Sequence, residues 1–155
     1  MQTLSSELQA RAAKIRLLIM DVDGVLTDGR IFIRDNGEEI KSFHMLDGHG
    51  LKMLQNSGVQ TAIITGRDAP SVGLRVKQLG INHYFKGIHD KRAAYAELRG
   101  LAGVADDRLA KFAPREAGPS QPGEDGRASR AQGRIAVSEQ VALLLEDAGL
   151  PDAAR

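Results

Sequence analysis

The chain of 155 residues contains no cysteine. This absence excludes disulfide bonds, thiolate metal sites and cysteine nucleophiles, and it fits a reducing compartment such as the cytoplasm. The sequence also lacks any apolar run near the roughly 20 residues that cross a bilayer. Its longest strongly apolar runs are at 17–20 and 61–65. Residues 1–16 are mixed and amphipathic, without a long apolar block, so no signal peptide is predicted.

The chain carries almost no net charge, because 21 Lys and Arg residues against 20 Asp and Glu residues leave +1. Nothing in the composition therefore indicates the large basic surface of a nucleic-acid-binding protein. Apolar residues make up 42% and charged residues 26%, which is ordinary for a globular protein. The length suits one domain, with no nucleic acid and no membrane among its expected partners.

A local deficiency marks the last third of the chain. Residues 111–134 contain no Val, Ile, Leu or Met and are rich in Gly, Pro, Arg, Ser and Ala. Such a segment buries too little apolar surface to offset the entropy lost on ordering, so we expect it to be irregular or disordered. Apolar residues return at 135–145, which predicts a possible C-terminal helix followed by a tail to 155.

Residues 1–110 alternate between two kinds of pattern. Compact apolar runs that stop at polar residues predict buried parallel strands at 15–20, 60–64 and 81–85. Apolar residues at helical spacing predict helices at 4–14, 48–57, 69–79 and 90–101. Asn36-Gly37 predicts a hairpin between strand-like runs at 30–34 and 38–43. This order predicts an α/β fold with ligands at the carboxyl ends of the strands.

The most specific signal directly follows the first predicted strand, in the string Asp21-Val22-Asp23-Gly24-Val25-Leu26-Thr27-Asp28. A carboxylate attacks phosphorus competently when a metal neutralises the charge, and a second carboxylate can protonate the leaving oxygen and then activate water. Magnesium binds through a few carboxylates together with phosphate oxygens and water. Two acids at a strand end also occur in ordinary surface turns, so the pair alone leaves both readings open.

Two more polar groups follow later in the chain. Thr65-Gly66-Arg67 comes after the strand at 60–64, where a hydroxyl and a backbone amide can bind a phosphate oxygen. Thr65 alone can equally be a helix cap, whereas Arg67 adds a cation suited to an anionic substrate. Lys91 begins the helix at 90–101. A lysine beside a phosphoryl centre neutralises transition-state charge, although most lysines are solvated surface groups.

Together these motifs resemble those of the haloacid-dehalogenase superfamily of phosphohydrolases. The Gly-x-x-Asp-Lys-Arg run at 87–92 narrows the resemblance to the 3-deoxy-D-manno-octulosonate 8-phosphate phosphatase family, in its capless type. The resemblance implies a Rossmann-like parallel sheet flanked by helices, with Mg²⁺ as cofactor. It makes Asp21 the nucleophile, Asp23 the general acid/base, and Thr65 and Lys91 the other catalytic residues. Asp21 and the backbone carbonyl of Asp23 would hold the metal.

The resemblance extends to a substrate site. The predicted hairpin stands where many relatives carry a cap domain, and residues 43–50 look like the family's substrate loop. By resemblance, the residues that contact the sugar acid or its phosphate are Asp23, His44, Met45, Leu46, Asp47, Gly48, Lys52, Arg67, Arg75 and Lys91. Capless members assemble as tetramers through their hairpins. A homotetramer is therefore expected here, since Ile31, Phe32 and Ile33 would need cover.

The resemblance covers about residues 12–110. A strand ending in Gly-Asp-Asp should follow, with another Asp a few residues later, yet no acids of this motif stand near 113–115. Asp106 and Asp107 come too early and are not assigned to the metal. We therefore expect a phosphatase core at 1–110 and an incomplete or irregular C-terminal part. A reading frame lost near Lys111 is our hypothesis for the change in composition, and a divergent natural relative is the alternative.

The resemblance thus implies a magnesium-dependent phosphomonoester hydrolase that forms an aspartyl-phosphate. Its predicted substrate is 3-deoxy-D-manno-octulosonate 8-phosphate, a lipopolysaccharide precursor, and its predicted location is the cytoplasm. A relative made inactive by loss of the last metal motif is one alternative. A phosphatase for another sugar-acid phosphate is the other, since only the loop at 43–52 would distinguish it.

Overall fold

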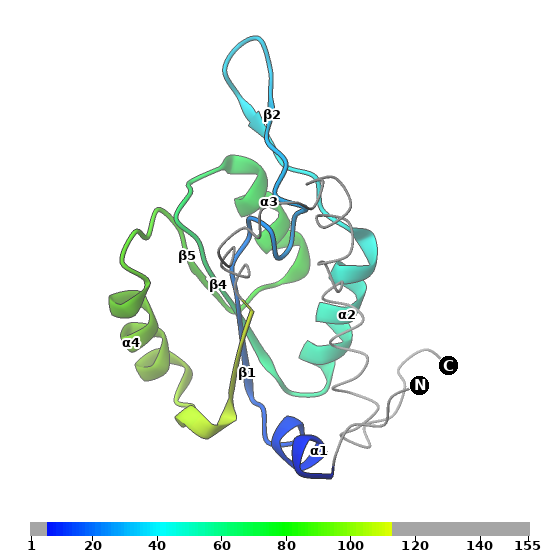
Figure 1. The fold of residues 1–155 in the computed structure, drawn as a ribbon, viewed down its shortest axis with the longest axis vertical. Helices are drawn as coiled ribbons and strands as arrows, with labels where there is room; N and C mark the ends of the chain where they lie inside the picture. Colours follow the sequence, from blue (N-terminus) through cyan, green and yellow to red (C-terminus); the bar gives the residue numbers. More distant parts are fainter. Residues whose placement is uncertain (1–5, 113–155) are drawn as a thin grey trace, which may run out of the picture.

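A computed structural model describes residues 6–112 of the chain (Figure 1). Residues 113–134 of the segment predicted to be irregular, and the predicted C-terminal helix, lie outside these residues. The first two residues of that segment, Lys111 and Phe112, are in a strand, so the prediction is wrong for them. The described part contains a parallel sheet with helices on both faces and a hairpin that projects from the body (Figure 1).

The sheet consists of four parallel strands in the order β5-β4-β1-β6. These strands are β1 (Leu17–Met20), β4 (Gln60–Ile64), β5 (His83–Phe85) and β6 (Leu109–Phe112). All four residues of the central strand β1 are buried, as its uninterrupted apolar run predicts. The expected α/β fold is confirmed, and the predicted strand at 60–64 has the same bounds as β4.

Side chains of β1 alternate between two cores. Leu18 and Met20 pack in a cluster with residues of α2 (Met45–Asn56) and α3 (Pro70–Leu79). Leu17 and Ile19 point to the other face and pack with Leu98 of α4 (Lys91–Ala102). Period-two alternation in a strand produces this division. Each of these three helices therefore covers one face of the sheet, and its first residue lies at the carboxyl edge.

Local signals set the ends of these helices. Pro70 begins α3, where its missing N–H costs nothing, and Gly80 ends it in the left-handed conformation with φ 62°. Asp90 caps α4 because its side chain accepts a hydrogen bond from the backbone N–H of Arg92. A shorter helix, α1 (Ser6–Ala12), precedes β1. None of the helices within residues 6–112 is long and apolar enough to cross a membrane.

The predicted hairpin is confirmed, with β2 (Phe32–Ile33) paired antiparallel to β3 (Glu39–Ile40). Gly37 lies in the turn with φ 82°, a conformation that glycine adopts without strain. The arm extends well beyond the sheet and its helices (Figure 1). Several large apolar side chains on or near it are exposed, among them Ile31, Phe32 and Ile33.

No residue pattern predicted strand β6, although the resemblance implied a strand after residue 110. It pairs in parallel with β1 and extends to Phe112, two residues past the predicted end of the core. A short 3₁₀ turn, Asp106–Arg108, precedes it. Because β6 runs parallel to β1, this turn lies at the amino edge of the sheet. Asp106 and Asp107 therefore lie away from Asp21, in agreement with their exclusion from the metal site.

Candidate active site

Asp21 follows the last residue of β1 and stands at the carboxyl edge of the sheet. Its Oδ1 accepts a hydrogen bond of 2.7 Å from the backbone N–H of Val22, and its side chain is only 14% exposed. The chain then turns, and the carbonyl of Val22 accepts bonds from the amides of residues 25–27. The buried Thr27 hydroxyl fixes this turn, since it donates to the carbonyl of Val22 and accepts from the amides of Gly24 and Gly29. The loop therefore holds Asp21 in a fixed orientation.

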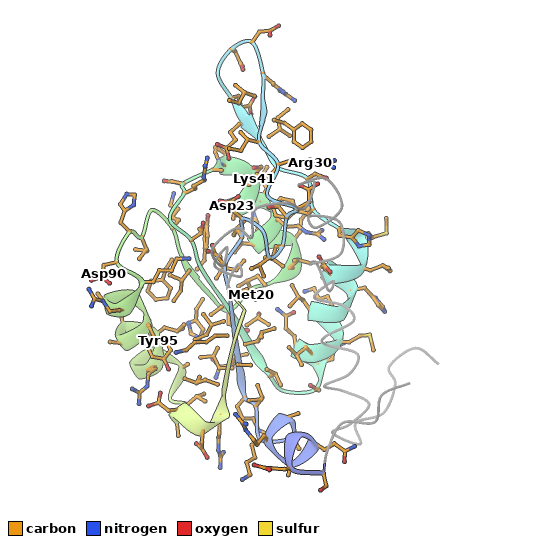
Figure 2. The ribbon with its side chains drawn as sticks, viewed as in Figure 1. Met20, Asp23, Arg30, Lys41, Asp90 and Tyr95 are labelled. Carbon is orange, nitrogen blue, oxygen red and sulfur yellow. The ribbon has the colours of Figure 1, made fainter. Side chains whose placement is uncertain are left out.

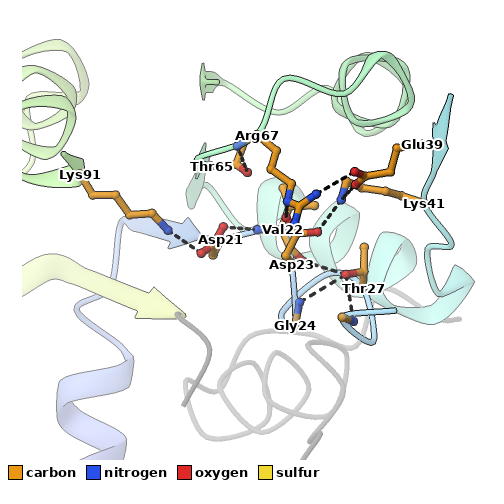
Figure 3. A network of polar contacts seen from close by, with 11 residues as sticks. Asp21, Val22, Asp23, Gly24, Thr27, Glu39, Lys41, Thr65, Arg67 and Lys91 are labelled. Atoms are coloured by element: carbon orange, nitrogen blue, oxygen red, sulfur yellow. Dashed lines mark hydrogen bonds and ion pairs between the residues drawn. The ribbon is translucent and has the colours of Figure 1, made fainter. Parts of the chain in front are cut away.

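Lys91, the first residue of α4, reaches Asp21 from the other side (Figure 3). Its Nζ lies 2.5 Å from Asp21 Oδ2. A cavity of about 250 Å³ adjoins both residues and is otherwise lined mainly by apolar side chains, including Met20 and Tyr95. An ammonium group beside a carboxylate at a cavity wall suits the binding of a phosphoryl group.

Thr65 and Arg67 extend the group from β4. Thr65 is buried, and its hydroxyl accepts a 3.3 Å hydrogen bond from the backbone N–H of Arg67. The Arg67 guanidinium points toward the loop after β1, where Nε lies 3.4 Å from Asp23 Oδ2. The structure thus brings Asp21, Asp23, Arg67 and Lys91 to one edge of the sheet, with Thr65 beside Arg67.

Two charged residues that were not predicted complete this group. Lys41 Nζ lies 2.5 Å from Asp23 Oδ1 and 2.6 Å from Glu39 Oε1, and Glu39 Oε2 lies 2.7 Å from Arg67 Nη1. Figure 2 places Lys41 and Asp23 together at the base of the hairpin. Glu39 is in β3 and Lys41 directly follows this strand, and two side chains at this spacing lie on the same face of an extended segment. That spacing was the available sequence signal.

Opposing effects set the pKa values of Glu39 and Lys41. The hydrogen bond from Lys41 outweighs burial and lowers the pKa of Glu39. Burial alone would lower the pKa of Lys41, but its hydrogen bonds to Asp23 and Glu39 and the charges of these two groups together raise that pKa. Both groups are therefore charged at neutral pH.

The predicted substrate loop leads into α2. His44 caps this helix, because its Nδ1 accepts from the backbone N–H of Leu46. Met45 and Leu46 are exposed, whereas Asp47 and Gly48 are buried. The loop is held from α3, where Arg75 Nη2 donates to the carbonyl of His44.

A cavity of about 410 Å³ lies between this loop and α3, with Lys41, Phe43, Met45 and Arg75 in its wall. The Arg75 guanidinium also lies 5.8 Å from the centroid of the Phe43 ring. Its buried Nε has no hydrogen-bond partner among the described residues. Arg75 and the start of α2 are thus placed together, as the resemblance implied.

Lys52 is not placed with this group. It is exposed on α2, and its Nζ lies 3.2 Å from where a Cβ on Gly80 would be. Gly80 ends α3 and precedes β5, which places it at the amino edge of the sheet. Within one chain, Lys52 therefore lies at the opposite end from Asp21, because two helical turns separate it from the loop.

The oxygen donors at this edge suit magnesium, which binds through one or two carboxylates and completes its shell with phosphate oxygens and water. Asp21 offers a carboxylate and Asp23 a carboxylate and a backbone carbonyl. The carboxylates of Asp21 and Asp23 also contact Lys91 and Lys41, so a bound metal would share these carboxylates with the two ammonium groups. Within residues 6–112 no group of three or more His, Cys, Asp or Glu side chains is arranged to hold a metal.

Several known proteins resemble this chain in sequence and in fold. No family model matches the sequence. The 3-deoxy-D-manno-octulosonate 8-phosphate phosphatase of Escherichia coli strain BL21-DE3 is 43% identical over 107 residues, which is 69% of this chain and 57% of that relative. The structure of a Moraxella catarrhalis phosphatase of the same name, in complex with magnesium, phosphate and KDO, superimposes with a TM-score of 0.76 at 31% identity. That comparison covers 93% of each chain.

The chain belongs to the 3-deoxy-D-manno-octulosonate 8-phosphate phosphatase family of the haloacid-dehalogenase superfamily.

A Legionella pneumophila structure assigned to subfamily III A of the same superfamily agrees, with a TM-score of 0.78 at 37% identity and coverage of 92% of this chain and 88% of that chain. The resemblance inferred from the motifs is thereby confirmed. The match to the E. coli phosphatase spans little more than half of that protein. Family membership therefore rests on the 107 residues that the two chains share.

Proposed function

We propose that this chain hydrolyses the phosphate monoester of a sugar acid, 3-deoxy-D-manno-octulosonate 8-phosphate, through an aspartyl-phosphate on Asp21. The observation that carries the proposal is the position of Lys91 Nζ, 2.5 Å from Asp21 Oδ2 beside a cavity. This pairing places a cation where negative charge accumulates during transfer to phosphorus.

In the first half-reaction, a carboxylate oxygen of Asp21 attacks phosphorus and the bond from phosphorus to the sugar oxygen breaks. The electron pair stays on that oxygen, which takes a proton from Asp23. In the second half-reaction Asp23 accepts a proton from water, whose oxygen attacks phosphorus and releases Asp21 and phosphate. Thr65 and Lys91 bind the phosphoryl oxygens in both halves.

Magnesium fits the donor set at this edge and would be held by Asp21 and the backbone carbonyl of Asp23. When bound, it neutralises charge on the phosphoryl oxygens. The bound magnesium and phosphate of the Moraxella catarrhalis relative support this part of the proposal.

The substrate is inferred from the loop at the start of α2. The Moraxella catarrhalis relative contains KDO, and its sequence similarity extends over this chain. Met45 and Arg75 line the cavity in which we place the sugar acid. The other residues that we assign to this substrate are at the N-cap and in the first turn of α2: His44, Leu46, Asp47 and Gly48. Arg67 would bind the phosphate end. Another sugar acid of similar length remains the competing substrate, because the same loop would bind its carboxylate.

One observation favours a catalytically impaired relative as a second candidate. The described residues contain no cluster of three acids, and Asp106 and Asp107 lie at the amino edge of the sheet. A weak metal site would leave the phosphate-binding residues in place but remove the charge neutralisation that the attack needs. Such a chain would bind phosphate without turning over.

We also propose a homotetramer built on the hairpin. Exposed apolar side chains are concentrated on the arm and at the start of α2, where Ile33 is 70% and Met45 is 82% exposed. A concentration of exposed apolar side chains favours a protein interface. A cytoplasmic location and a role in making the lipopolysaccharide precursor are part of the same proposal.

Phosphate release from 3-deoxy-D-manno-octulosonate 8-phosphate, measured with magnesium and with a chelator, tests the proposal. We expect magnesium-dependent turnover that Asp21→Asn abolishes. Asp28→Asn, in which an exposed acid of the same loop loses its charge, is the matched control and should keep full activity. Phosphate binding without turnover in the unaltered chain would instead establish the impaired relative.

A further inference from the structure

Asp23 belongs to a closed ring of four charged side chains (Figure 3). Lys41 joins Asp23 Oδ1 to Glu39 Oε1 at 2.5 and 2.6 Å. Arg67 joins Glu39 Oε2 to Asp23 Oδ2 at 2.7 and 3.4 Å. The two cationic side chains, Lys41 and Arg67, alternate around the ring with the two carboxyl groups of Asp23 and Glu39. The ring connects three segments: the loop after β1, the base of the hairpin, and the turn after β4.

The four members differ in exposure. The Lys41 side chain is 2% exposed, whereas those of Asp23 and Arg67 are 36% and 49% exposed. A buried ammonium group without partners is costly, so Lys41 holds its two carboxylates much more firmly than a surface lysine would. The Arg67 contact is open to water and weaker. Lys41 is therefore the residue that fixes the orientation of Asp23.

The two oxygens of Asp23 are consequently unequal. Oδ1 is bound at 2.5 Å by the buried ammonium of Lys41, whereas Oδ2 faces only the half-exposed Arg67 at 3.4 Å. An oxygen held by a buried cation is poorly placed to carry a transferable proton. Oδ2 is then the atom from which a proton can reach a leaving oxygen.

We propose that Lys41 is a positioning residue for Asp23. Lys41 holds Oδ1 of Asp23 and leaves Oδ2 for proton exchange with the leaving group. The same contact ties the base of the hairpin to Asp23. This inference rests on the proposed function for its catalytic part. In the step concerned, the bond from phosphorus to the sugar oxygen breaks, its electron pair stays on oxygen, and the proton on Asp23 Oδ2 passes to that oxygen. Water returns the proton to Oδ2 when the aspartyl-phosphate is hydrolysed.

Substrates with different leaving groups separate positioning from a general structural role. A sugar alkoxide needs the proton from Asp23, whereas p-nitrophenolate departs as a stable anion. We expect Lys41→Met to lower kcat on the sugar-acid phosphate about 100-fold, the lower end for general acid–base catalysis, and to change kcat on p-nitrophenyl phosphate less than about threefold. Lys41→Arg, which keeps the charge, should recover part of the loss, and Lys14→Met, at an exposed lysine, should match the unaltered chain.

Equal losses on both substrates, or no loss on either, would overturn the proposal. Should Lys41→Met not fold, Lys41→Gln takes its place with the same expectation, because glutamine retains a donor but not the charge.

Amide hydrogen exchange of the hairpin tests the fastening without any need for turnover. Lys41→Met and Asp23→Asn should both speed exchange of the amides between Ile31 and Lys41, because each removes one side of the buried ion pair. Asp28→Asn should not. A chain inactive on both substrates would end the proposed function yet still give this result. Unchanged exchange in both variants would overturn the inference whatever the activity.

Discussion

Lys91 Nζ lies 2.5 Å from Asp21 Oδ2, although 70 positions separate the two residues in the chain. The contact forms because α4 packs on the face of the sheet that carries Leu17 and Ile19, which brings the first residue of the helix to the end of β1. The packing of α4 on the sheet thus places a cation beside the proposed nucleophile. We expect this contact to matter more for the rate of catalysis than for the stability of the fold.

Removal of this cation should affect rate far more than stability. We expect Lys91→Met to lower kcat by about 100- to 1,000-fold, the usual effect of losing one transition-state donor. The Lys91 side chain is 45% exposed, so its ion pair contributes less than about 1 kcal/mol to folding. Steady-state kinetics and thermal unfolding measure the two effects. Lys86→Met is the matched control, because Lys86 is similarly exposed and pairs with Asp68; a comparable fall in kcat there would contradict the assignment.

Gly48 lies against Arg75, and a methyl group should disturb the substrate loop. A Cβ on Gly48 would lie 2.4 Å from Arg75 Nη2, so the guanidinium must move. We expect Gly48→Ala to raise KM for the sugar-acid phosphate about tenfold, the size of one lost hydrogen bond to a charged group, with kcat little changed. Gly73→Ala on α3 meets no atom within 4 Å and should instead stabilise the fold by about 0.5–1 kcal/mol. An unaltered KM in Gly48→Ala would remove Arg75 from the substrate site.

The charge of Glu39 makes stability depend on pH. Its pKa is lowered below the ordinary value of 4.5, chiefly by the hydrogen bond from Lys41 acting against burial. A carboxyl with a depressed pKa stabilises the fold above its unfolded pKa, and this stabilisation is lost as pH falls through the folded pKa. Unaltered protein should therefore have a higher Tm than Glu39→Gln at pH 7, and the difference should shrink below pH 4.5. Glu38→Gln controls for the loss of a neighbouring acid; a difference in Tm that persists unchanged at low pH would refute the mechanism.

The hairpin surface should control assembly. Ile33 is 70% exposed on β2, and an aspartate there would place charge in the proposed interface. We expect Ile33→Asp to reduce the mass measured by light scattering below that of a tetramer. Leu101→Asp, at a side chain 62% exposed on α4, should leave the mass unchanged. A tetramer that survives Ile33→Asp, or dissociates only with Leu101→Asp, would place the interface elsewhere.

Sequence patterns predicted the elements whose signal is local. The apolar run at 60–64 matches β4, and Asn36-Gly37 predicted the hairpin. Strand β6 had no pattern of its own to predict it, because its four residues, which include Lys111, show no clear alternation of apolar and polar side chains. Pairing with β1 makes them a strand. The ring of charges was missed for a similar reason, since Lys41 and Asp23 are 18 positions apart and meet only when the base of the hairpin passes over the loop.

The fold brings together some of the site residues that the resemblance implied, but not all of them. Asp21, Arg67 and Lys91 converge because each stands directly at or after the carboxyl end of a strand or at the start of a helix on that edge. Lys52 does not, because its position two turns into α2 carries it toward Gly80. Spacing along the sequence therefore predicted position well at strand ends and poorly within a helix.

Chemical trapping of Asp21 tests the central claim most directly. The unaltered chain would be mixed with 3-deoxy-D-manno-octulosonate 8-phosphate and magnesium, quenched with borohydride, and digested for mass spectrometry. Borohydride reduces an aspartyl-phosphate to homoserine, so the account predicts homoserine at position 21, dependent on substrate and absent when a chelator replaces magnesium. Phosphate release with Asp21 unmodified, or the same modification without substrate, would contradict the account.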